Sequence, residues 1–310
     1  MTTELATIKH KAFDVDILAG QVRKSTADKY LGKLNAYLDF AGSVEAALNP
    51  ATFAKWRASM ATGKLSPNTI NLHLASVRSL LKEAASQGYI SSELAEQFKS
   101  VRGVKVSAMK DKLKQNARTK ISPEDMRRLC DAPQADTLVG KMHRALLLTM
   151  ASSGARISEV VTLKLTQIEA RKKGKVESFV IVVSGKTDTG NREAPLSSEA
   201  FKAIQEWIQA RAAVSVKSEF IFTGFSGRGG RDPRSTHIST EAAWQTVKRY
   251  AEQCKLAHVK PHDFRRFVGT NLAKDNPRQA QKALGHKKIT TTYDHYVLDE
   301  MEVGLTENMF

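Results

Sequence analysis

The pattern of hydrophobic and polar residues predicts a helical first part of the chain. Apolar residues recur three or four positions apart in four segments, which begin at Ser, Asn or Pro and mostly end at Gly. This spacing is typical of amphipathic helices with capped ends. The four segments are residues 25–42, 50–63, 67–88 and 92–99. The pattern therefore predicts a helical domain over residues 25–104, preceded by an irregular arm over residues 1–24.

Residues 121–310 combine helical and strand-like patterns. An apolar run from Lys141 to Met150 predicts a buried helix. The segments SFVIVVS and NREAPLS flank the turn GKTDTG and predict a β-hairpin, and EFIFTG predicts another short strand. GFSGRGGRDPRST predicts a flexible loop, and its glycines lack the closing Gly-Lys-Ser/Thr of a phosphate-binding P-loop. We therefore expect a two-domain, mainly α fold with a small antiparallel sheet.

The segment that joins the two predicted domains, residues 105–120, is strongly basic. It lacks an amphipathic pattern, so we expect an exposed linker. Such a linker could hold a duplex through phosphate contacts, or it could simply be solvated. Its candidate DNA contacts are Lys110, Lys112, Lys114 and Arg118.

The overall charge favours a polyanionic partner. The 310 residues include 48 Lys and Arg against 32 Asp and Glu, for a net charge of +16, and nucleic acid is the commonest partner of such a chain. A membrane surface is the rival, but the sequence has neither an apolar run of transmembrane length nor a signal peptide, so we expect a cytoplasmic protein. Cys130 and Cys254 are too few for a disulfide framework.

The third predicted helix carries small polar and basic residues away from its apolar face. Such a face could lie in a DNA groove, with the basic side chains on phosphates, or it could be an ordinary solvated surface. The candidate DNA contacts are Asn68, Thr69, Asn71, His73, Arg78 and Lys82.

The segment from Pro261 to Tyr296 concentrates reactive side chains. It reads PHDFRRFVGTNL, a short polar break and then KALGHKKITTTYDHY. Tyrosines can act as nucleophiles, histidines can move protons, and an arginine keeps its charge at working pH. A phosphodiester needs such partners, because guanidinium groups match its charged oxygens.

Five motifs in this order resemble those of the tyrosine recombinases, the family of the phage integrases, Cre and Xer. They are GARISEVVTLKL, SGKTDTGNREAPL, PHDFRRFVGTNLA, LGHKKI and a tyrosine shortly afterwards. SPNTINLHLASVRSLLKEAASQGYI also resembles the family's core DNA-binding domain, so the likeness covers roughly residues 25–300. It implies that residues 121–310 form a mixed α/β catalytic domain.

The resemblance implies a covalent strand-transfer mechanism. Arg156 and Arg265 would clamp the scissile phosphate and stabilise the charge of its transition state. Tyr296 would attack the phosphorus and form a 3′-phosphotyrosyl link. Lys186, in the hairpin turn, would protonate the leaving 5′-oxygen. No metal, ATP or other cofactor is implied, because the phosphotyrosine conserves the energy of the broken bond.

Three further residues have supporting roles by the same resemblance. His262 would assist proton transfer from the tyrosine, and His286 would hydrogen-bond the phosphate. Glu159 would orient His262 and Arg265 from behind. Each of these residues could instead have a structural role, such as a helix cap or a surface charge.

Three positions leave alternatives open. The nucleophile of the family usually lies nine or ten residues after the histidine of Leu-Gly-His; we favour Tyr296, at ten, over Tyr293, at seven. Arg266, where a histidine is common, could compete with Arg265 for the phosphate. Arg192, after the hairpin turn, is a rival to Lys186.

The resemblance also implies the partners. We expect duplex DNA with inverted-repeat core sites, a homotetramer on two synapsed duplexes, a monomer in free solution, accessory DNA-bending proteins and a nucleoid-associated location. The tail after Tyr296 could pack on a neighbouring protomer or cap its own domain. Two other functions remain open, namely a type IB topoisomerase-like enzyme and a DNA-binding accessory protein without catalysis.

Overall fold

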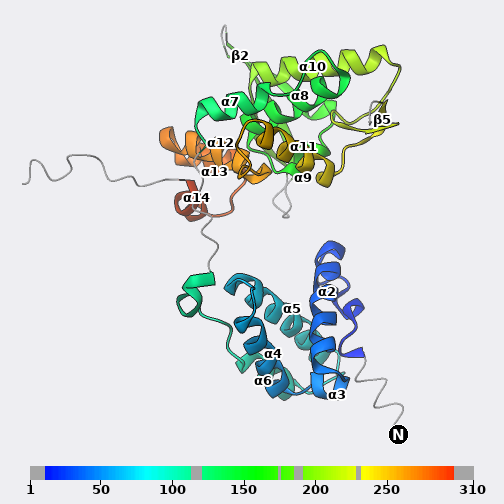
Figure 1. Cartoon of the computed structure of the whole chain (residues 1–310), viewed down its shortest axis with the longest axis vertical. Helices are drawn as coiled ribbons and strands as arrows, with labels where there is room; N and C mark the ends of the chain where they lie inside the picture. The colour runs from blue at the N-terminus through cyan, green and yellow to red at the C-terminus, as the bar shows by residue number, and fades with distance from the viewer. Residues whose placement is uncertain (1–10, 113–120, 174–175, 185–190, 228–231, 297–310) are drawn as a thin grey trace, which may run out of the picture. The chain divides into compact units, whose positions relative to one another are not determined.

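The chain folds into two compact units, Met1–Asn116 and Ala117–Phe310, each with its own hydrophobic core (Figure 1). The computed structural model describes residues 11–112, 121–173, 176–184, 191–227 and 232–296. Two separate cores agree with the two-domain organisation that the sequence pattern predicts. The finer boundaries at residues 25, 105 and 121 stay predictions.

The first unit is helical in its described residues. Start signals explain its helices, because the side chains of Asn49, Ser66 and Ser91 each accept a hydrogen bond from the first turn that follows. Its elements are η1 (Val15–Leu18), α2 (Lys24–Ala41), α3 (Val44–Ala47), α4 (Pro50–Thr62), α5 (Pro67–Ser86), α6 (Ser92–Ser100) and η2 (Val106–Lys112).

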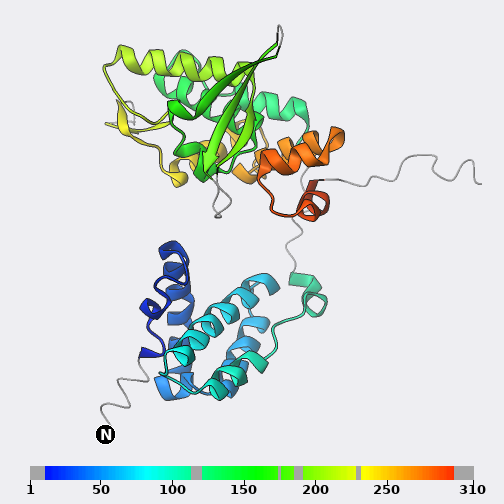
Figure 2. The same ribbon diagram turned by 180° about the vertical axis from the view of Figure 1, so that it is seen from behind.

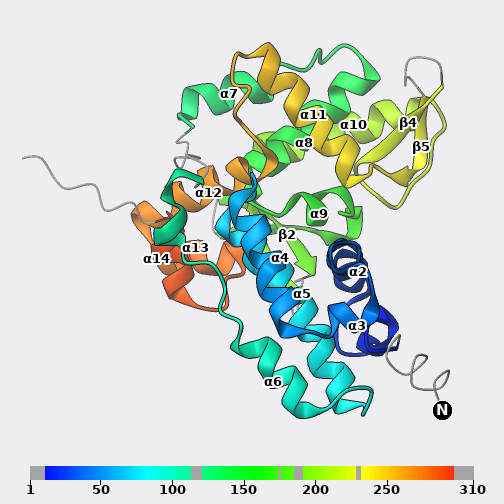
Figure 3. The same ribbon diagram turned by 60° about the horizontal axis from the view of Figure 1, so that its bottom comes forward.

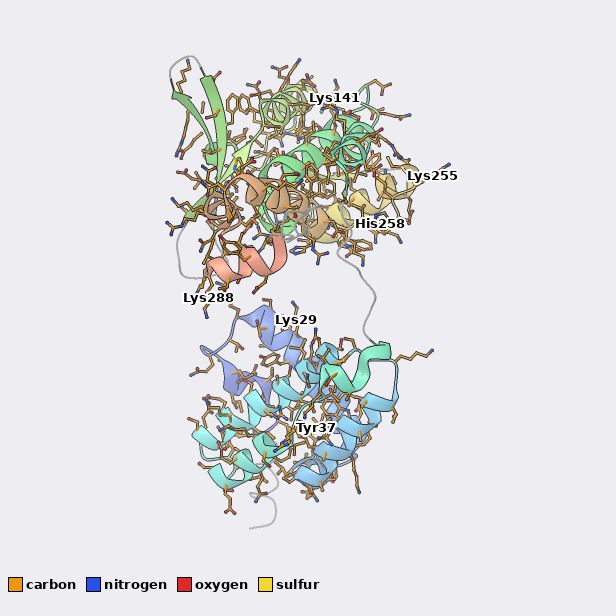
Figure 4. All side chains as sticks on the ribbon, turned by 90° about the vertical axis from the view of Figure 1, so that its left-hand side faces the viewer. Lys29, Tyr37, Lys141, Lys255, His258 and Lys288 are labelled. Atoms are coloured by element: carbon orange, nitrogen blue, oxygen red, sulfur yellow. The ribbon has the colours of Figure 1, made fainter. Side chains whose placement is uncertain are left out.

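Aromatic side chains fill the core of the first unit. Tyr37 lies among its helices (Figure 4) and contacts Phe53 with the ring centroids 5.3 Å apart. The expectation of an irregular N-terminal arm over residues 1–24 is partly wrong, because Phe13 and Leu18 are buried in this same core. Residues 11–23 therefore pack on the helical domain, since they supply apolar side chains that the weak pattern did not reveal.

The second unit packs helices around the long apolar helix α8. Ten of the residues of α8 are buried, and α10 lies along it, as Figure 1 also shows. The helices of the unit are α7 (Pro123–Asp131), α8 (Leu138–Ser153), α9 (Ile157–Val161), η3 (Leu165–Gln167), α10 (Ser198–Ala213), α11 (Thr240–Gln253), α12 (Pro261–Asp275), α13 (Pro277–Leu284) and α14 (Ile289–Tyr296).

Two small antiparallel sheets complete the second unit (Figure 2). The first has the order β1-β2-β3, which confirms the predicted hairpin and places Val183 opposite Arg192. The strands are β1 (Ile168–Lys173), β2 (Val176–Ser184), β3 (Asn191–Leu196), β4 (Thr223–Ser226) and β5 (Asp232–His237).

Two of these strands were absent from the sequence prediction. β5 begins inside the segment expected as a flexible loop and ends one residue beyond it, and β1 precedes the predicted hairpin. The expected strand EFIFTG shares only Thr223 and Gly224 with β4. Both β1 and β5 are rich in polar residues. In β1 apolar and polar positions alternate only from Ile168 to Arg171, and β5 is mostly exposed and shows no such alternation. The predicted fold class, mainly α with small antiparallel sheets, is nevertheless confirmed. Among the described helices, none is both long and apolar enough to cross a membrane.

Candidate active site

Arg265 lies at the centre of a polar cluster in the second unit. It is 2% exposed on the second turn of α12, and its guanidinium donates to the carbonyl of Gly154 at 2.9 Å and to that of Leu284 at 2.5 Å. These carbonyls stand at the C-terminal ends of α8 and α13. Helix C-termini carry partial negative charge, so they hold the cation without a full countercharge.

The electrostatic surroundings of Arg265 are positive. Burial lowers the pKa of Arg265 to about 10, and the charges of Arg156 and Arg192 add to this effect. Among the described residues, no carboxylate forms an ion pair with Arg265, although Glu159 contributes a weaker opposing charge. A buried cation in such surroundings favours an anionic ligand.

Arg156 and Glu159 are joined at the first turn of α9. The carboxylate of Glu159 accepts from the Arg156 backbone N–H at 2.7 Å and from its guanidinium at 2.8 Å. Glu159 also accepts from Arg192 at 2.5 Å. The described hydrogen bonds of the Glu159 carboxylate thus go to Arg156 and Arg192, toward which the helix cap turns it. Its expected role in orienting His262 and Arg265 from behind stays a prediction.

The turn after α13 places His286 beside Arg265. Gly285 ends the helix with a φ of 66°, a conformation that favours glycine. The Nε2 atom of His286 lies 3.3 Å from the Arg265 guanidinium, and its Nδ1 atom lies 2.9 Å from the hydroxyl of Thr292. Because the guanidinium can only donate, this network favours a neutral ring with its proton on Nδ1.

Tyr296 packs against the same histidine. The two rings are stacked, with their centroids 5.3 Å apart, and Tyr296 is 4% exposed. Its ring also fills the space beside Gly269, where an added Cβ would lie 2.5 Å from Tyr296 Cδ1. Tyr293, by contrast, is 51% exposed. Of the two candidate tyrosines, Tyr296 is therefore the one that lies in the cluster.

The helices that build this cluster come from the end of the chain. α12, α13 and α14 pack on one another and lie side by side in Figure 1 and Figure 3. His262 is exposed in the first turn of α12. Partial desolvation of its ring lowers the pKa of His262, and the charges of Arg266 and Arg265 lower it further.

Arg266 and Lys186 complete the inventory of predicted site residues. Arg266 lies 3.3 Å from the carboxylate of Asp263 and is 39% exposed on its side chain, so Arg265 rather than Arg266 points into the cluster. Lys186 lies outside the described residues. The strands on either side of its turn end at Ser184 and begin at Asn191.

A comparison with known protein families shows to which family the chain belongs. The model of the phage integrase family matches residues 119–302, which include every residue of the cluster. The chain belongs to the phage integrase family, and so to the tyrosine recombinases. The resemblance inferred from the motifs is thereby confirmed.

Curated tyrosine recombinases are similar to this integrase-family chain. It is 30% identical to the tyrosine recombinase XerC of Haemophilus influenzae (strain Rd) over 71% of its own length and 75% of that protein. It is 29% identical to the tyrosine recombinase XerD of Neisseria meningitidis serogroup B over 59% of its length. The match spans about three fifths (60%) of that XerD.

Solved structures share the fold of this family member. The Tn1549 transposon integrase in complex with circular intermediate DNA matches with a TM-score of 0.66, at 18% identity and 98% coverage of both chains. The XerH recombinase bound to a palindromic difH substrate matches with a TM-score of 0.63, at 16% identity, over 98% of this chain and 95% of that one. At these identities the likeness concerns the fold.

The first unit of this integrase-family protein differs from the expectation for its third helix. The side chain of Asn71 exchanges two hydrogen bonds with the backbone of Val104, at 3.0 and 2.9 Å. His73 bonds the carbonyl of Thr69 at 2.8 Å and packs against Trp56. Asn71 and His73 therefore hold the domain together, which corrects their expected place on a free groove-facing surface.

Arg78 is also engaged within the first unit. It donates to the carbonyls of Phe98 and Val101 and lies over the ring of Phe53 at 5.6 Å. Asn68 and Lys82 are exposed on α5 and stay candidate DNA contacts, as does the half-buried Thr69. The side chains of Lys110, Lys112, Lys114 and Arg118 lie outside the described part of the chain.

Sequence reasoning missed two residues that shape the cluster. Thr292 is fully buried and orients His286, and Gly269 makes room for Tyr296. A signal existed for both, since Thr292 lies in the run Thr-Thr-Thr after Leu-Gly-His and Gly269 interrupts an otherwise ordinary helix.

Proposed function

We propose that this protein is a site-specific DNA recombinase that cleaves and rejoins strands through a 3′-phosphotyrosyl intermediate and a Holliday junction. The observation that carries the proposal is the convergence of Arg265, Arg156, His286 and Tyr296 in one cluster of the second unit. Independent structural roles do not explain why a buried tyrosine and several cations share one place.

The positive excess of the cluster suits a phosphodiester. Among the described residues, Glu159 is the one carboxylate that pairs with Arg156 and Arg192, and its charge offsets that of Arg265 only weakly. A phosphate that binds beside Arg265 and Arg156 receives charge-assisted hydrogen bonds from both guanidinium groups. The same donors stabilise the extra negative charge of the pentavalent transition state.

The chemical step is a transesterification. The hydroxyl oxygen of Tyr296 attacks the phosphorus, its proton passes toward His262, and the bond from phosphorus to the 5′-oxygen breaks. Lys186 gives a proton to the departing 5′-oxygen, so the products are a phosphotyrosyl ester and a 5′-hydroxyl. His286 donates a hydrogen bond to a phosphate oxygen after a change of tautomer or protonation. Attack by a second 5′-hydroxyl reverses the step, with neither ATP nor a metal.

The expected partners follow from this chemistry. Strand exchange between two duplexes needs four tyrosines, so we infer a homotetramer on synapsed inverted-repeat core sites that assembles from monomers. The tail after Tyr296 and accessory DNA-bending proteins are candidate stabilisers of that assembly. The protein would act in the cytoplasm, on nucleoid DNA.

A trapping assay tests the proposal. Duplexes that bind the Tyr296→Phe variant are selected from a random pool, and a nick is then placed near the expected cleavage point so that the released fragment diffuses away. Wild-type protein with chelator present should give a covalent DNA adduct on a denaturing gel. Peptide mapping should locate the DNA on Tyr296.

The outcomes separate the proposal from its rivals. Tight binding without an adduct favours the accessory DNA-binding protein and contradicts the proposed chemistry. An adduct together with relaxation of supercoiled DNA that lacks the selected site favours the topoisomerase-like enzyme. Recombination of a plasmid with two selected sites supports the recombinase.

A further inference from the structure

Arg192 contacts the cluster through Glu159 and was expected only as a rival to Lys186. It stands in β3, two residues after the β2–β3 turn, and its side chain is 11% exposed. One terminal nitrogen donates to Glu159 at 2.5 Å and the other donates to the carbonyl of Ala283. Its fork thus joins α9 to the C-terminal end of α13.

Each of these two partners leads directly to a residue of the proposed site. Glu159 holds the guanidinium of Arg156 at 2.8 Å. Ala283 precedes the turn that carries His286, and Gly285 in that turn packs directly on Arg192, since an added Cβ would lie 2.4 Å from Arg192 Cδ. A shift of Arg192 would therefore move both sides of the phosphate site.

The hydrogen bonds and burial of Arg192 argue against a role as the proton donor. Both terminal nitrogens are engaged, and the Nε atom is buried without a partner among the described residues. That atom faces Gly285, where an added Cβ would lie only 2.8 Å away. A buried unpaired donor is destabilising, so close packing at this turn is kept at the expense of stability.

We propose that Arg192 is a positioning residue that sets the geometry of Arg156, through Glu159, and of His286, through the end of α13. This inference rests on the proposed recombinase function. The planar guanidinium has separate donors that can bridge a carboxylate and a carbonyl, whereas the single ammonium group of a lysine cannot form both hydrogen bonds in the same geometry. The role therefore requires arginine and is not met by positive charge alone.

The first experiment compares Arg192→Lys with a matched control, Arg171→Lys. Arg171 lies in the same sheet and pairs with Glu193, but its side chain is 48% exposed. The probe is the selected nicked duplex. We expect R192K to keep its DNA Kd within about twofold and to form adduct roughly 10²-fold more slowly, as a misplacement of about 1 Å can cause. R171K should match wild type in both.

A second substrate distinguishes positioning from proton donation. Replacing the bridging 5′-oxygen by sulfur gives a leaving group of lower pKa, which departs without a proton. The rate of a Lys186→Ala variant should recover on this substrate, while the rate of R192K should stay low. Recovery of R192K would assign the proton donor role to Arg192 and overturn the proposal.

A third comparison keeps the test valid if R192K loses stability. Glu159→Gln keeps the shape of the side chain and removes its charge, and it should reproduce the slow adduct formation with Kd unchanged. A wild-type rate in either folded variant overturns the inference. If wild-type protein itself forms no adduct, the proposed function fails first, so the two failures are distinguishable.

Discussion

Arg78 in the first unit, which is half-buried, and Arg265 in the second, which is fully buried, are two arginines with closely similar hydrogen bonding. Each lies on a long helix, each donates to two main-chain carbonyls, and burial lowers the pKa of both. Their surroundings differ. Arg78 lies over the ring of Phe53 and near the charge of Arg57, whereas Arg265 meets His286, Tyr296 and the charges of Arg156 and Arg192.

This difference separates a structural arginine from a candidate catalytic one. A guanidinium that bonds only carbonyls and an aromatic ring links parts of one domain and has no further task. A guanidinium held by carbonyls beside a histidine, a tyrosine and other cations keeps its charge for an anion. The side chains around an arginine therefore indicate its role better than its burial does.

The largest effect is expected at Tyr296, the nucleophile candidate beside Arg265. Tyr296→Phe should abolish the covalent adduct and leave DNA binding unchanged, since only the attacking oxygen is removed. The control is Tyr293→Phe, which removes an exposed hydroxyl and should keep the wild-type rate. Gel analysis of both variants on the nicked duplex checks this, and an adduct in Tyr296→Phe would contradict the assignment.

The comparison itself is tested by conservative changes at both arginines. Arg265→Lys should slow adduct formation by about 10²–10³-fold, the range for removal of one transition-state donor. Arg78→Lys should change the rate by less than about threefold but lower the free energy of unfolding by about 1–3 kcal/mol, because two partly buried carbonyls lose their donors. Single-turnover rates and urea unfolding measure the two effects. Equal rates in both variants would remove the distinction.

The second unit should also show a pH-dependent stability that is unrelated to the site. Burial lowers the pKa of His143 to about 4, and the charge of Arg249 adds to this. Between pH 6.5 and 4 the unfolded chain binds a proton that the folded unit does not, so stability falls as the pH falls through this window. The loss should total about 3 kcal/mol.

Urea unfolding at pH 7.5 and pH 4 measures this dependence. In His143→Gln the free energy of unfolding should fall less between pH 7.5 and pH 4 than in wild type. In His258→Gln, changed at an exposed position of the same unit, it should fall as much as in wild type. If the free energy of unfolding of His143→Gln depended on pH as strongly as that of wild type, the pKa of His143 would not be lowered by folding.

The smallest effects are expected at two helical glycines, one in each unit. Gly269→Ala should lower the free energy of unfolding by about 1–3 kcal/mol through overpacking against Tyr296. Gly32 in α2 has no atom within 4 Å of an added Cβ, so Gly32→Ala should stabilise the first unit by about 0.5–1 kcal/mol. Thermal unfolding measures the sign of each stability change. Stabilisation by Gly269→Ala would contradict the close packing of Tyr296 against Gly269.

The sequence predicted those features that depend on local patterns. Helix periodicity and Ser or Asn caps placed α4, α5 and α6, and the apolar run placed α8 in the core. The order of motifs identified the family and most of the cluster. These features were accessible because a cap, an amphipathic face and a motif each lie within a few consecutive residues.

Features that depend on contacts between distant segments were not predictable. Nothing near Arg192 indicates that it meets Glu159, which lies 33 positions earlier, and Ala283, which lies 91 positions later. The polar face of α5 looked free because the segment around Val104, which occupies Asn71, is not adjacent in sequence. Such pairings are set by tertiary packing, which a single sequence does not display.

The main-chain partners of Arg265 have a consequence for how this enzyme family can vary. The carbonyls of Gly154 and Leu284 hold the guanidinium, and every amino acid supplies a carbonyl. Their direction is fixed by where α8 and α13 end, not by the identity of a side chain. Side chains around this arginine can therefore change widely while the backbone keeps its placement.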